Sequence, residues 1–209
     1  MGALLMSAAP EFHVSHVHDE PAQWPCPPAD GYVADHLDQL PDLPPHTELI
    51  DGSLVFVSPQ TRFHMRAMRL LENYLVQAAP PELDVIREMT ITLGPKNRPE
   101  PDLLVAKAEA DTGPGQTTFQ PKDVVLAVEV VSPESEARDR DTKPRKYAAA
   151  GIPHFWRVES DGGLPVVYVF ELEPATKAYV PTGIYRDLLK VGVPFTIDID
   201  LTEINPRRQ

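Results

Sequence analysis

The chain has 209 residues, of which 42% are hydrophobic and 24% charged, a composition typical of one large globular domain with or without a tail. Its formal net charge of -12 argues against a protein that adheres to nucleic acid or anionic membrane by bulk charge alone. The single cysteine, Cys26, excludes an intrachain disulfide, and no apolar stretch approaches the ~20 residues of a membrane span, so we expect a cytoplasmic protein.

The N-terminal part differs in composition from the rest of the chain. Residues 1–45 are rich in proline, acidic and free of Lys and Arg. We therefore predict a Pro-rich acidic N-terminal arm over residues 1–45, ordered if at all by docking, and a single domain over residues 46–209. HLDQL (36–40) is compatible with one helical turn. The arm also holds His13, His16 and His18, but no second ligand cluster of zinc-like spacing accompanies them.

The predicted domain begins with a β-hairpin. Residues 46–59, HTELIDGSLVFVSP, contain Asp51-Gly52 between two apolar runs, which is a strong signal for a two-residue hairpin turn. Glu48 lies on the first of the two expected strands.

Residues 61–79 predict an amphipathic helix that begins at the N-cap Thr61 and ends before Pro80-Pro81. One stripe at a spacing of 3.6 residues is expected to face inward and consists of His64, Met68, Leu71, Leu75 and Ala78. A polar stripe is expected to face outward and consists of Arg62, Arg66, Arg69 and Asn73.

The rest of the chain alternates apolar runs with one further helical segment. Residues 142–150 predict a helix that ends at Gly151. Strands are predicted at 84–93, 101–107, 124–131, 154–159 and 166–172, and short strands are candidates at 178–180 and 194–199. This order indicates a mixed α/β (α+β) fold with one helix packed on each side of a sheet.

Two carboxylates interrupt otherwise apolar strands. Asp102 opens one strand, and Glu129 lies inside the run VVLAVEVV. An unpaired buried carboxylate costs several kcal/mol, and two neighbouring carboxylates raise each other's pKa unless a cation neutralises them. A hard divalent ion such as Mg²⁺ or Mn²⁺, which binds through oxygen ligands, meets this need. A lysine partner, a structural ion pair or a glutamate at a strand end are the alternatives.

A basic segment follows the strand that carries Glu129. RDRDTKPRKY (138–147) leads into the predicted helix, so one of its side chains can fold back over the carboxylates. Lys143 precedes Pro144, and proline favours the first helical turn, which predicts Lys143 near a helix N-terminus. A lysine there can hold a phosphate or orient a water. A solvated charged segment is the alternative.

These segments together resemble a known family. ELIDGSLVFVSP, RPEPDLLVA and VVLAVEVVSPESEARDRDTKPRKYAAAGIPHFWRVE, with His64 opening a helix, are similar to the Uma2 family of restriction-endonuclease-like proteins over about residues 47–172. The resemblance implies a PD-(D/E)XK nuclease core with flanking helices and the N-terminal arm. Tyr147, Gly151, Pro153 and Trp156 also match, and we interpret them as scaffold residues.

The resemblance also implies a catalytic site. Asp102 takes the position of the PD aspartate and Glu129 the acidic position, and the backbone carbonyl of Val130 is implied as a further metal ligand. Val131 stands where the nuclease pattern has its lysine, on the same face of the strand as Glu129. The Uma2-like pattern instead places that lysine on the following helix, which matches Lys143.

Glu48 and His64 match family positions expected near the same site. Glu48 is implied as a metal ligand or an acid/base group, and His64 as a contact to phosphate or water; a hydrogen-bonded core histidine is the alternative for His64. The implied activity is Mg²⁺- or Mn²⁺-dependent hydrolysis of DNA phosphodiester bonds. We expect a homodimer, because two symmetric sites suit two DNA strands. The alternative is an inactive nuclease-fold module that binds protein or nucleic acid.

Overall fold

A six-stranded mixed sheet forms the centre of the computed structural model, which describes residues 26–205. Its strands are β3 (Leu83–Arg87), β5 (Leu103–Lys107), β7 (Val124–Val130), β8 (His154–Asp161), β9 (Leu164–Glu173) and β10 (Ala178–Tyr185). They lie in the order β10-β9-β8-β7-β5-β3, antiparallel except for the parallel pair β7–β8. The predicted mixed α/β fold is confirmed. Residues 1–25 of the predicted arm, which include His13, His16 and His18, lie outside the described residues.

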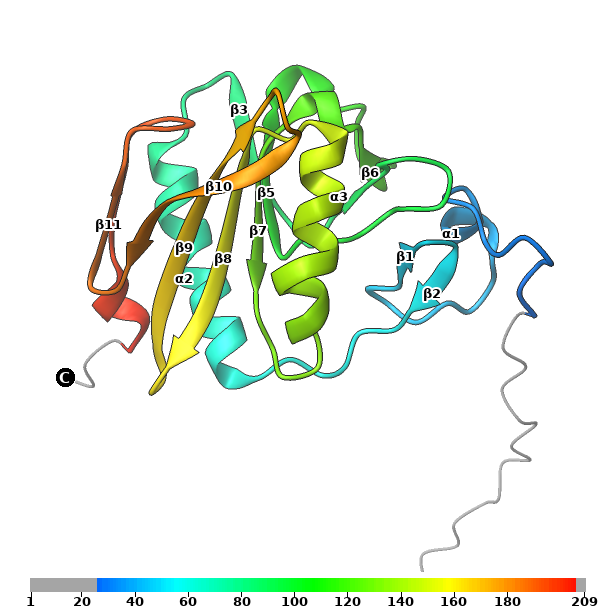
Figure 1. Cartoon of the computed structure of the whole chain (residues 1–209), viewed down its shortest axis with the longest axis horizontal. Helices are drawn as coiled ribbons and strands as arrows, with labels where there is room; N and C mark the ends of the chain where they lie inside the picture. Colours follow the sequence, from blue (N-terminus) through cyan, green and yellow to red (C-terminus); the bar gives the residue numbers. More distant parts are fainter. Residues whose placement is uncertain (1–25, 206–209) are drawn as a thin grey trace, which may run out of the picture.

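One helix covers each face of the sheet, as the sequence predicts (Figure 1). Helix α2 (Arg62–Ala78) buries Leu71 and Leu75 in a cluster with apolar residues of β5, β7, β8 and β9. Helix α3 (Lys143–Ala150) buries Tyr147 in a second cluster on the other face, which includes Phe155 of β8. The predicted N-cap is also confirmed, because the Thr61 hydroxyl accepts the His64 N–H at 3.2 Å.

The predicted hairpin consists of β1 (Glu48–Ile50) and β2 (Ser53–Val55) and lies beside the sheet (Figure 1). Asp51 and Gly52 have φ angles of 49° and 78°, the positive values that a type I′ turn requires at both positions. The backbones of Leu49 and Arg98 exchange two hydrogen bonds, of 3.1 and 2.8 Å. The hairpin is thereby tied to the segment that leads into β5.

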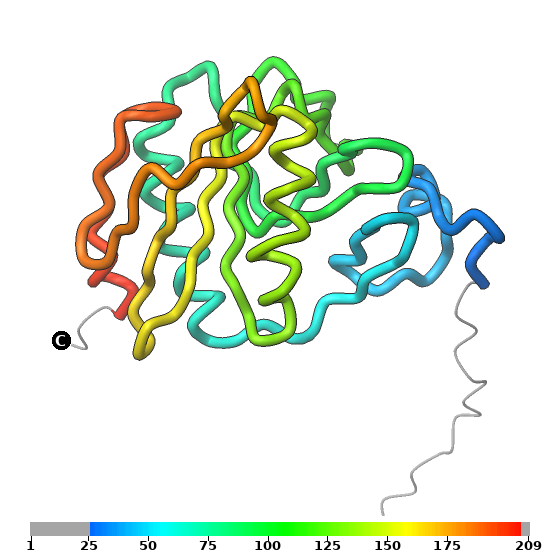
Figure 2. The backbone as a smooth tube through the Cα atoms, viewed as in Figure 1, coloured from blue at the N-terminus to red at the C-terminus, as the bar shows by residue number. Residues whose placement is uncertain are grey.

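Residues 26–45 pack on the hairpin side of the molecule, where the blue part of the tube in Figure 2 runs. They include the single helical turn α1 (His36–Gln39). The Arg98 guanidinium is buried and reaches Asp38 at 2.5 Å, and it also donates to the Ala34 carbonyl at 3.1 Å. This buried arginine ties the segment to the domain.

The predicted strand over residues 84–93 is wrong in its continuity. Strand β3 ends at Arg87, Glu88 adopts φ 49°, and a separate short strand β4 (Thr90–Ile91) pairs with β6 (Thr118–Phe119). The Glu88 N–H donates to the Asp102 carbonyl at 3.1 Å, which stabilises this break next to the candidate site. The β-rich pattern of DVIREMTITL does not reveal a left-handed residue in its middle.

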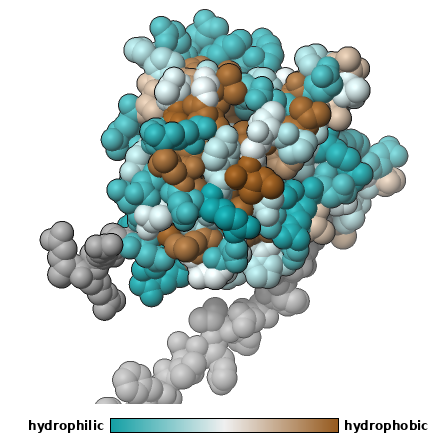
Figure 3. Space-filling model, turned by 60° about the vertical axis from the view of Figure 1, so that its left-hand side comes forward, coloured by the Kyte–Doolittle hydropathy of each residue, from teal (hydrophilic) through white to brown (hydrophobic). Residues whose placement is uncertain are grey.

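Strand β11 (Leu188–Val191) was not predicted, and it pairs with β12 (Ile197–Asp200) before the short 3₁₀ turn η4 (Leu201–Ile204). These elements close one end of the main core by burying Leu189 and Ile199. The face shown in Figure 3 is largely hydrophilic, with separate apolar patches. Within the described residues, no helix combines the length and apolar character needed to cross a bilayer.

Candidate active site

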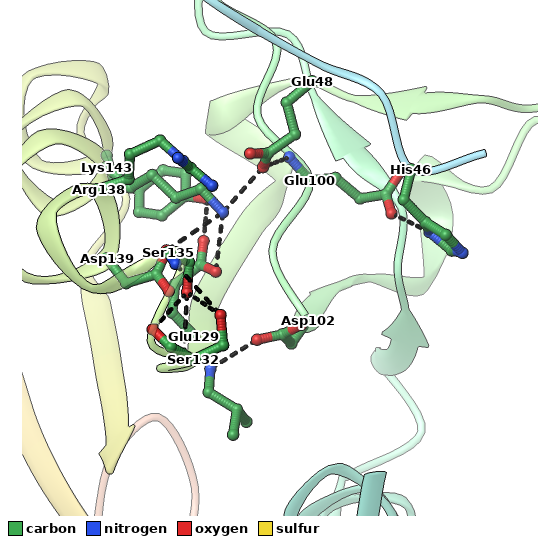
Figure 4. Close-up of polar contacts among 12 residues, drawn as sticks. His46, Glu48, Glu100, Asp102, Glu129, Ser132, Ser135, Arg138, Asp139 and Lys143 are labelled. Atoms are coloured by element: carbon green, nitrogen blue, oxygen red, sulfur yellow. Dashed lines mark hydrogen bonds and ion pairs between the residues drawn. The ribbon is translucent and has the colours of Figure 1, made fainter. Parts of the chain in front are cut away.

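Lys143 lies at the centre of the site, with three carboxylates around its ammonium group (Figure 4). Its Nζ lies 2.8 Å from Glu48 Oε1, 3.0 Å from Glu129 Oε2 and 3.5 Å from Asp139 Oδ1, and all four side chains are buried. Burial lowers the pKa of Lys143, but the carboxylates outweigh this effect and raise it well above its usual value. Segments far apart in the sequence therefore converge on one cation.

Glu129, on β7, has two donors of its own. The Tyr147 hydroxyl donates to its Oε1 at 2.6 Å and Lys143 donates to its Oε2 at 3.0 Å. Burial raises the pKa of Glu129 well above its usual value; Lys143 opposes this shift, and nearby carboxylates, led by Asp139 and Asp102, add to it. Tyr147, which the sequence analysis interpreted as scaffold, thus also contacts the candidate site. A tyrosine hydroxyl one helical turn beyond Lys143 is the signal that was available in the sequence.

Asp102 is fixed by hydrogen bonds to both of its carboxylate oxygens. Its Oδ2 accepts the Val130 N–H at 2.6 Å, and its Oδ1 lies 2.8 Å from His64 Nε2. The pairing of β5 with β7 ends at Leu103 opposite Val128. The Val130 N–H lies beyond this pairing, and the Asp102 side chain satisfies it. Asp102 lies just before β5 rather than on it.

His64 is buried on the inner face of α2, in the predicted stripe, and it also lines the cavity of the site. Its Nε2 is held by Asp102, while its Nδ1 is buried without a hydrogen-bond partner among the described residues. The structure shows the alternative for His64, a buried hydrogen-bonded histidine, and its partner is the predicted site carboxylate Asp102. Contact with phosphate or water stays a prediction.

The connection between β7 and α3 contains a π-helical turn, η3 (Arg138–Thr142). Lys143 is the first residue of α3, so its predicted place near a helix N-terminus is confirmed, and the π-helical turn runs directly into this helix. This turn buries Asp139, a residue for which the sequence predicted no role, so the alternative of a solvated charged segment does not hold at this position. Burial raises the pKa of Asp139, and Lys143 and the Ser135 hydroxyl partly offset this effect. The signal for Asp139 was its place four residues before Lys143, on the same helix face.

A cavity of about 290 Å³ is lined by these residues and by a second cluster of polar side chains. Glu48, Asp102, Glu129, Val130, Asp139, Lys143 and His64 all line it, together with Arg138, Glu88, Glu100 and His46. His46 Nδ1 lies 2.5 Å from Glu100 Oε1, and the Glu100 N–H donates to Glu48 Oε1 at 2.8 Å. The hydrogen bond to Glu100 raises the pKa of His46, and burial raises that of Glu100.

The donor types around the cavity fit a hard divalent cation. The charge of Asp102 contributes to the raised pKa of Glu129, so the two carboxylates repel each other through the protein, and a cation held by both relieves this repulsion. Among residues 26–205, no three His, Cys, Asp or Glu side chains are placed to hold one metal ion. Mg²⁺ in proteins is usually bound through one or two carboxylates, with water and substrate phosphate as further ligands. Asp102 and Glu129 fit such a two-carboxylate site.

Val131 lies one residue beyond β7, and its N–H donates to the Val158 carbonyl at 2.8 Å. An aliphatic side chain at this position supplies no positive charge to the site. Lys143 supplies a positive charge instead, from α3, whose side chains Lys143 and Tyr147 both contact Glu129 of β7. The structure thus brings together every predicted site residue: Glu48, His64, Asp102, Glu129, Val130 and Lys143.

Comparison with known proteins identifies a family and a structural relative. The model of the Uma2 family, described as "Putative restriction endonuclease", matches residues 34–202. The crystal structure of a putative nuclease belonging to DUF820 from Anabaena variabilis ATCC 29413 superposes with a TM-score of 0.61 at 16% identity, covering 81% of this chain and 95% of that chain. At this identity the likeness shows a shared fold. No curated protein matches the chain significantly.

Proposed function

The chain belongs to the Uma2 family, and we propose that it is a Mg²⁺- or Mn²⁺-dependent endonuclease that hydrolyses phosphodiester bonds of DNA. One observation carries this proposal. Buried Glu48, Glu129 and Asp139 surround the Lys143 ammonium, and Asp102 faces the same cavity of about 290 Å³. Such an excess of carboxylate over cation favours a divalent ion, and the lysine beside it suits a negatively charged phosphate.

Each residue receives a role from its contacts. Asp102, Glu129 and the Val130 carbonyl would hold the ion, which supplies a water of lowered pKa and offsets charge on the phosphate. His64 and the Val130 N–H fix the orientation of Asp102. Lys143 carries the positive charge that neutralises the reacting phosphate or orients the attacking water. Glu48 accepts a proton or serves as a further oxygen ligand.

A non-catalytic module that binds protein or nucleic acid is the second candidate, because Val131 stands in the position of the nuclease lysine and the chain is acidic. Under the proposal, Lys143 replaces that lysine. The two candidates differ in a simple measurement, since a binding module leaves plasmid DNA intact whatever metal is added.

The test compares two aspartate variants of the full chain. Supercoiled plasmid is incubated with Mn²⁺ or Mg²⁺ and with the wild type, Asp102→Asn or Asp198→Asn. Asp198 is an exposed residue of β12 that pairs with Lys190, so its variant has the same chemical change away from the cavity. We expect the wild type and Asp198→Asn to nick the plasmid, and Asp102→Asn to be slower by about a hundredfold or more.

Two outcomes would overturn the assignment. Equal nicking by Asp102→Asn and the wild type would place the activity elsewhere or in a contaminant. No nicking by any variant, together with no Mn²⁺ binding in calorimetry, would favour the non-catalytic module. The proposed homodimer is tested separately by light scattering, and a monomeric mass with and without DNA contradicts it.

A further inference from the structure

The cations of this acidic protein are mostly paired with carboxylates. Within residues 26–205, the Lys and Arg residues that form no ion pair with a carboxylate are Arg62, Arg66, Arg69, Lys96, Lys122 and Lys177. Lys96 is bonded to the carbonyls of Asp30 and Gly31. Lys122 and Lys177 are isolated from each other in the sequence, whereas the three arginines share one helix. The unpaired positive charge is therefore concentrated on α2.

The three arginines form one stripe on the solvent side of this helix. Arg62, Arg66 and Arg69 are spaced four and three residues apart, so they lie on one face, and Asn73 and Gln77 continue the same line. Arg62 and Arg69 are exposed and Arg66 is half-buried, and the stripe contains no carboxylate. At ~1.5 Å per residue the three arginines span about 10 Å, roughly three phosphates of a DNA strand, and the polar line extended to Gln77 spans about 22 Å.

A groove of about 490 Å³ accompanies the stripe between α2 and η4. Arg66, Arg69, Asn73 and Gln77 line it, so most of its polar side chains are hydrogen-bond donors. The groove also contains Glu203, whose carboxylate accepts the Tyr74 hydroxyl at 2.8 Å. Arg66 reaches Asn205 Oδ1 at 2.6 Å, which holds the guanidinium over the groove without cancelling its charge.

The stripe begins next to the candidate active site. The residues that lead into α2, from Val57 to Gln60, line the catalytic cavity. His64, in the first turn of α2, contacts Asp102 from the opposite face of the same helix. Arg62 therefore lies two residues after the segment that lines the cavity and two before His64, on the outer face of the helix.

We infer that the Arg62–Arg66–Arg69 stripe binds the sugar-phosphate backbone of duplex DNA and guides it to the cavity. This inference rests on the proposed function, because it assigns the docking surface of the proposed substrate. Arginine suits the role because its planar guanidinium stays charged and can form two parallel hydrogen bonds to a phosphate. Contacts of this kind position the duplex without selecting its sequence.

The experiment measures DNA binding separately from cleavage. Fluorescence anisotropy of a labelled duplex of about 30 base pairs is recorded for the full chain in EDTA, between about 50 and 200 mM NaCl. The test variant combines Arg62→Gln, Arg66→Gln and Arg69→Gln. The matched control combines Lys122→Gln, Lys177→Gln and Lys190→Gln, which removes the same charge from exposed positions on other elements. Plasmid nicking is measured in parallel for all three proteins.

We expect the stripe variant to bind at least about tenfold more weakly, and the slope of log affinity against log salt to fall by about 2.7, or ~0.9 for each lost phosphate contact. The control is expected to keep the wild-type slope. Equal binding by the stripe variant and the control overturns the inference, and so does a wild type that binds no DNA. If the wild type binds through the stripe but nicks nothing, the docking surface stands and the proposed hydrolysis fails. If the wild type and the stripe variant bind and nick DNA equally well, the proposed hydrolysis stands and the docking surface fails.

Discussion

The contact between Tyr147 and Glu129 yields the sharpest test of the candidate site. Tyr147→Phe removes only a hydroxyl, which donates to Glu129 Oε1 at 2.6 Å, from a fully buried side chain. The ring keeps its packing against Phe155, whose centroid lies 6.0 Å away, so the change leaves almost no cavity. Any loss of stability therefore reports the hydrogen bond to the buried carboxylate.

The size of the effect follows from the charge of the acceptor. A hydrogen bond to a charged group contributes about 1.5–3 kcal/mol, and one to a neutral group about 0.5–1.5 kcal/mol. Tyr179→Phe is the matched control, because the Tyr179 hydroxyl donates to the neutral Ile152 carbonyl at 2.9 Å. We expect about 2 kcal/mol for Tyr147→Phe and about 1 kcal/mol for Tyr179→Phe, or a melting temperature lower by about 4–8 °C against 2–4 °C.

The dependence on pH supplies a second readout. The pKa of Glu129 is raised in the folded protein, so its ionisation costs stability as the pH rises from the unfolded value towards the folded one. The Tyr147 hydroxyl favours the ionised form and offsets part of this cost once Glu129 has lost its proton. Urea unfolding should therefore show the penalty of Tyr147→Phe shrinking as the pH falls through the folded pKa of Glu129. A penalty equal to that of Tyr179→Phe, or one independent of pH, would refute the assignment.

Three further changes probe the charge network and the segment that precedes it. Lys143→Met leaves the buried carboxylates without their shared cation. Thermal unfolding should therefore show a free energy of unfolding lower by about 3–5 kcal/mol near neutral pH, and a smaller loss in acid. A variant as stable as the wild type would contradict the ion pairs. Asp139→Asn removes a charge that raises the pKa of Glu129, so the acid limb of the pH–activity profile should move to lower pH; an unmoved limb would show that Glu129 does not control it. Arg98→Met leaves the partners of a buried guanidinium unsatisfied, so chemical unfolding should show a free energy of unfolding lower by about 3 kcal/mol. Limited proteolysis should also cut residues 26–45 faster, and unchanged cleavage would show that Arg98 does not anchor them.

The sequence predicted correctly those features that depend on neighbouring residues alone. Asp51-Gly52 predicted the hairpin because few residue pairs adopt two positive φ angles, and Thr61 predicted the start of α2 because its hydroxyl caps the first turn. The burial of Glu129 could be read from its apolar neighbours, and the question of its partner led to both a metal and a lysine. The structure shows the lysine, and the metal stays a proposal.

Long-range contacts account for what the sequence did not reveal. Asp139 Oδ1 lies 3.5 Å from Lys143 Nζ, and nothing in a charged run indicates the π-helical turn that buries Asp139; the Tyr147 hydroxyl reaches Glu129 from α3. Strand β11 combines exposed and buried residues, and Leu189 is buried only because β12 pairs with it and the main core lies beneath. Tyr147 contacts Glu129, which is 18 residues away, and Leu189 packs on the main core, so periodicity alone could not reveal either contact.

Under the proposed function, Lys143 takes the place of the strand lysine of the nuclease pattern, and its position in the fold shows how it can do so. A side chain at position 131 would project on the face of β7 that carries Glu129, and α3 covers that face through Tyr147. The first turn of α3 therefore lies over Glu129, and a lysine there reaches the same carboxylate from above. Under the proposed function the site needs an ammonium beside Glu129, and Lys143 provides one at 3.0 Å. Under the proposed function, valine at 131 is therefore no argument against catalysis, because Lys143 supplies a positive charge beside Glu129 from α3.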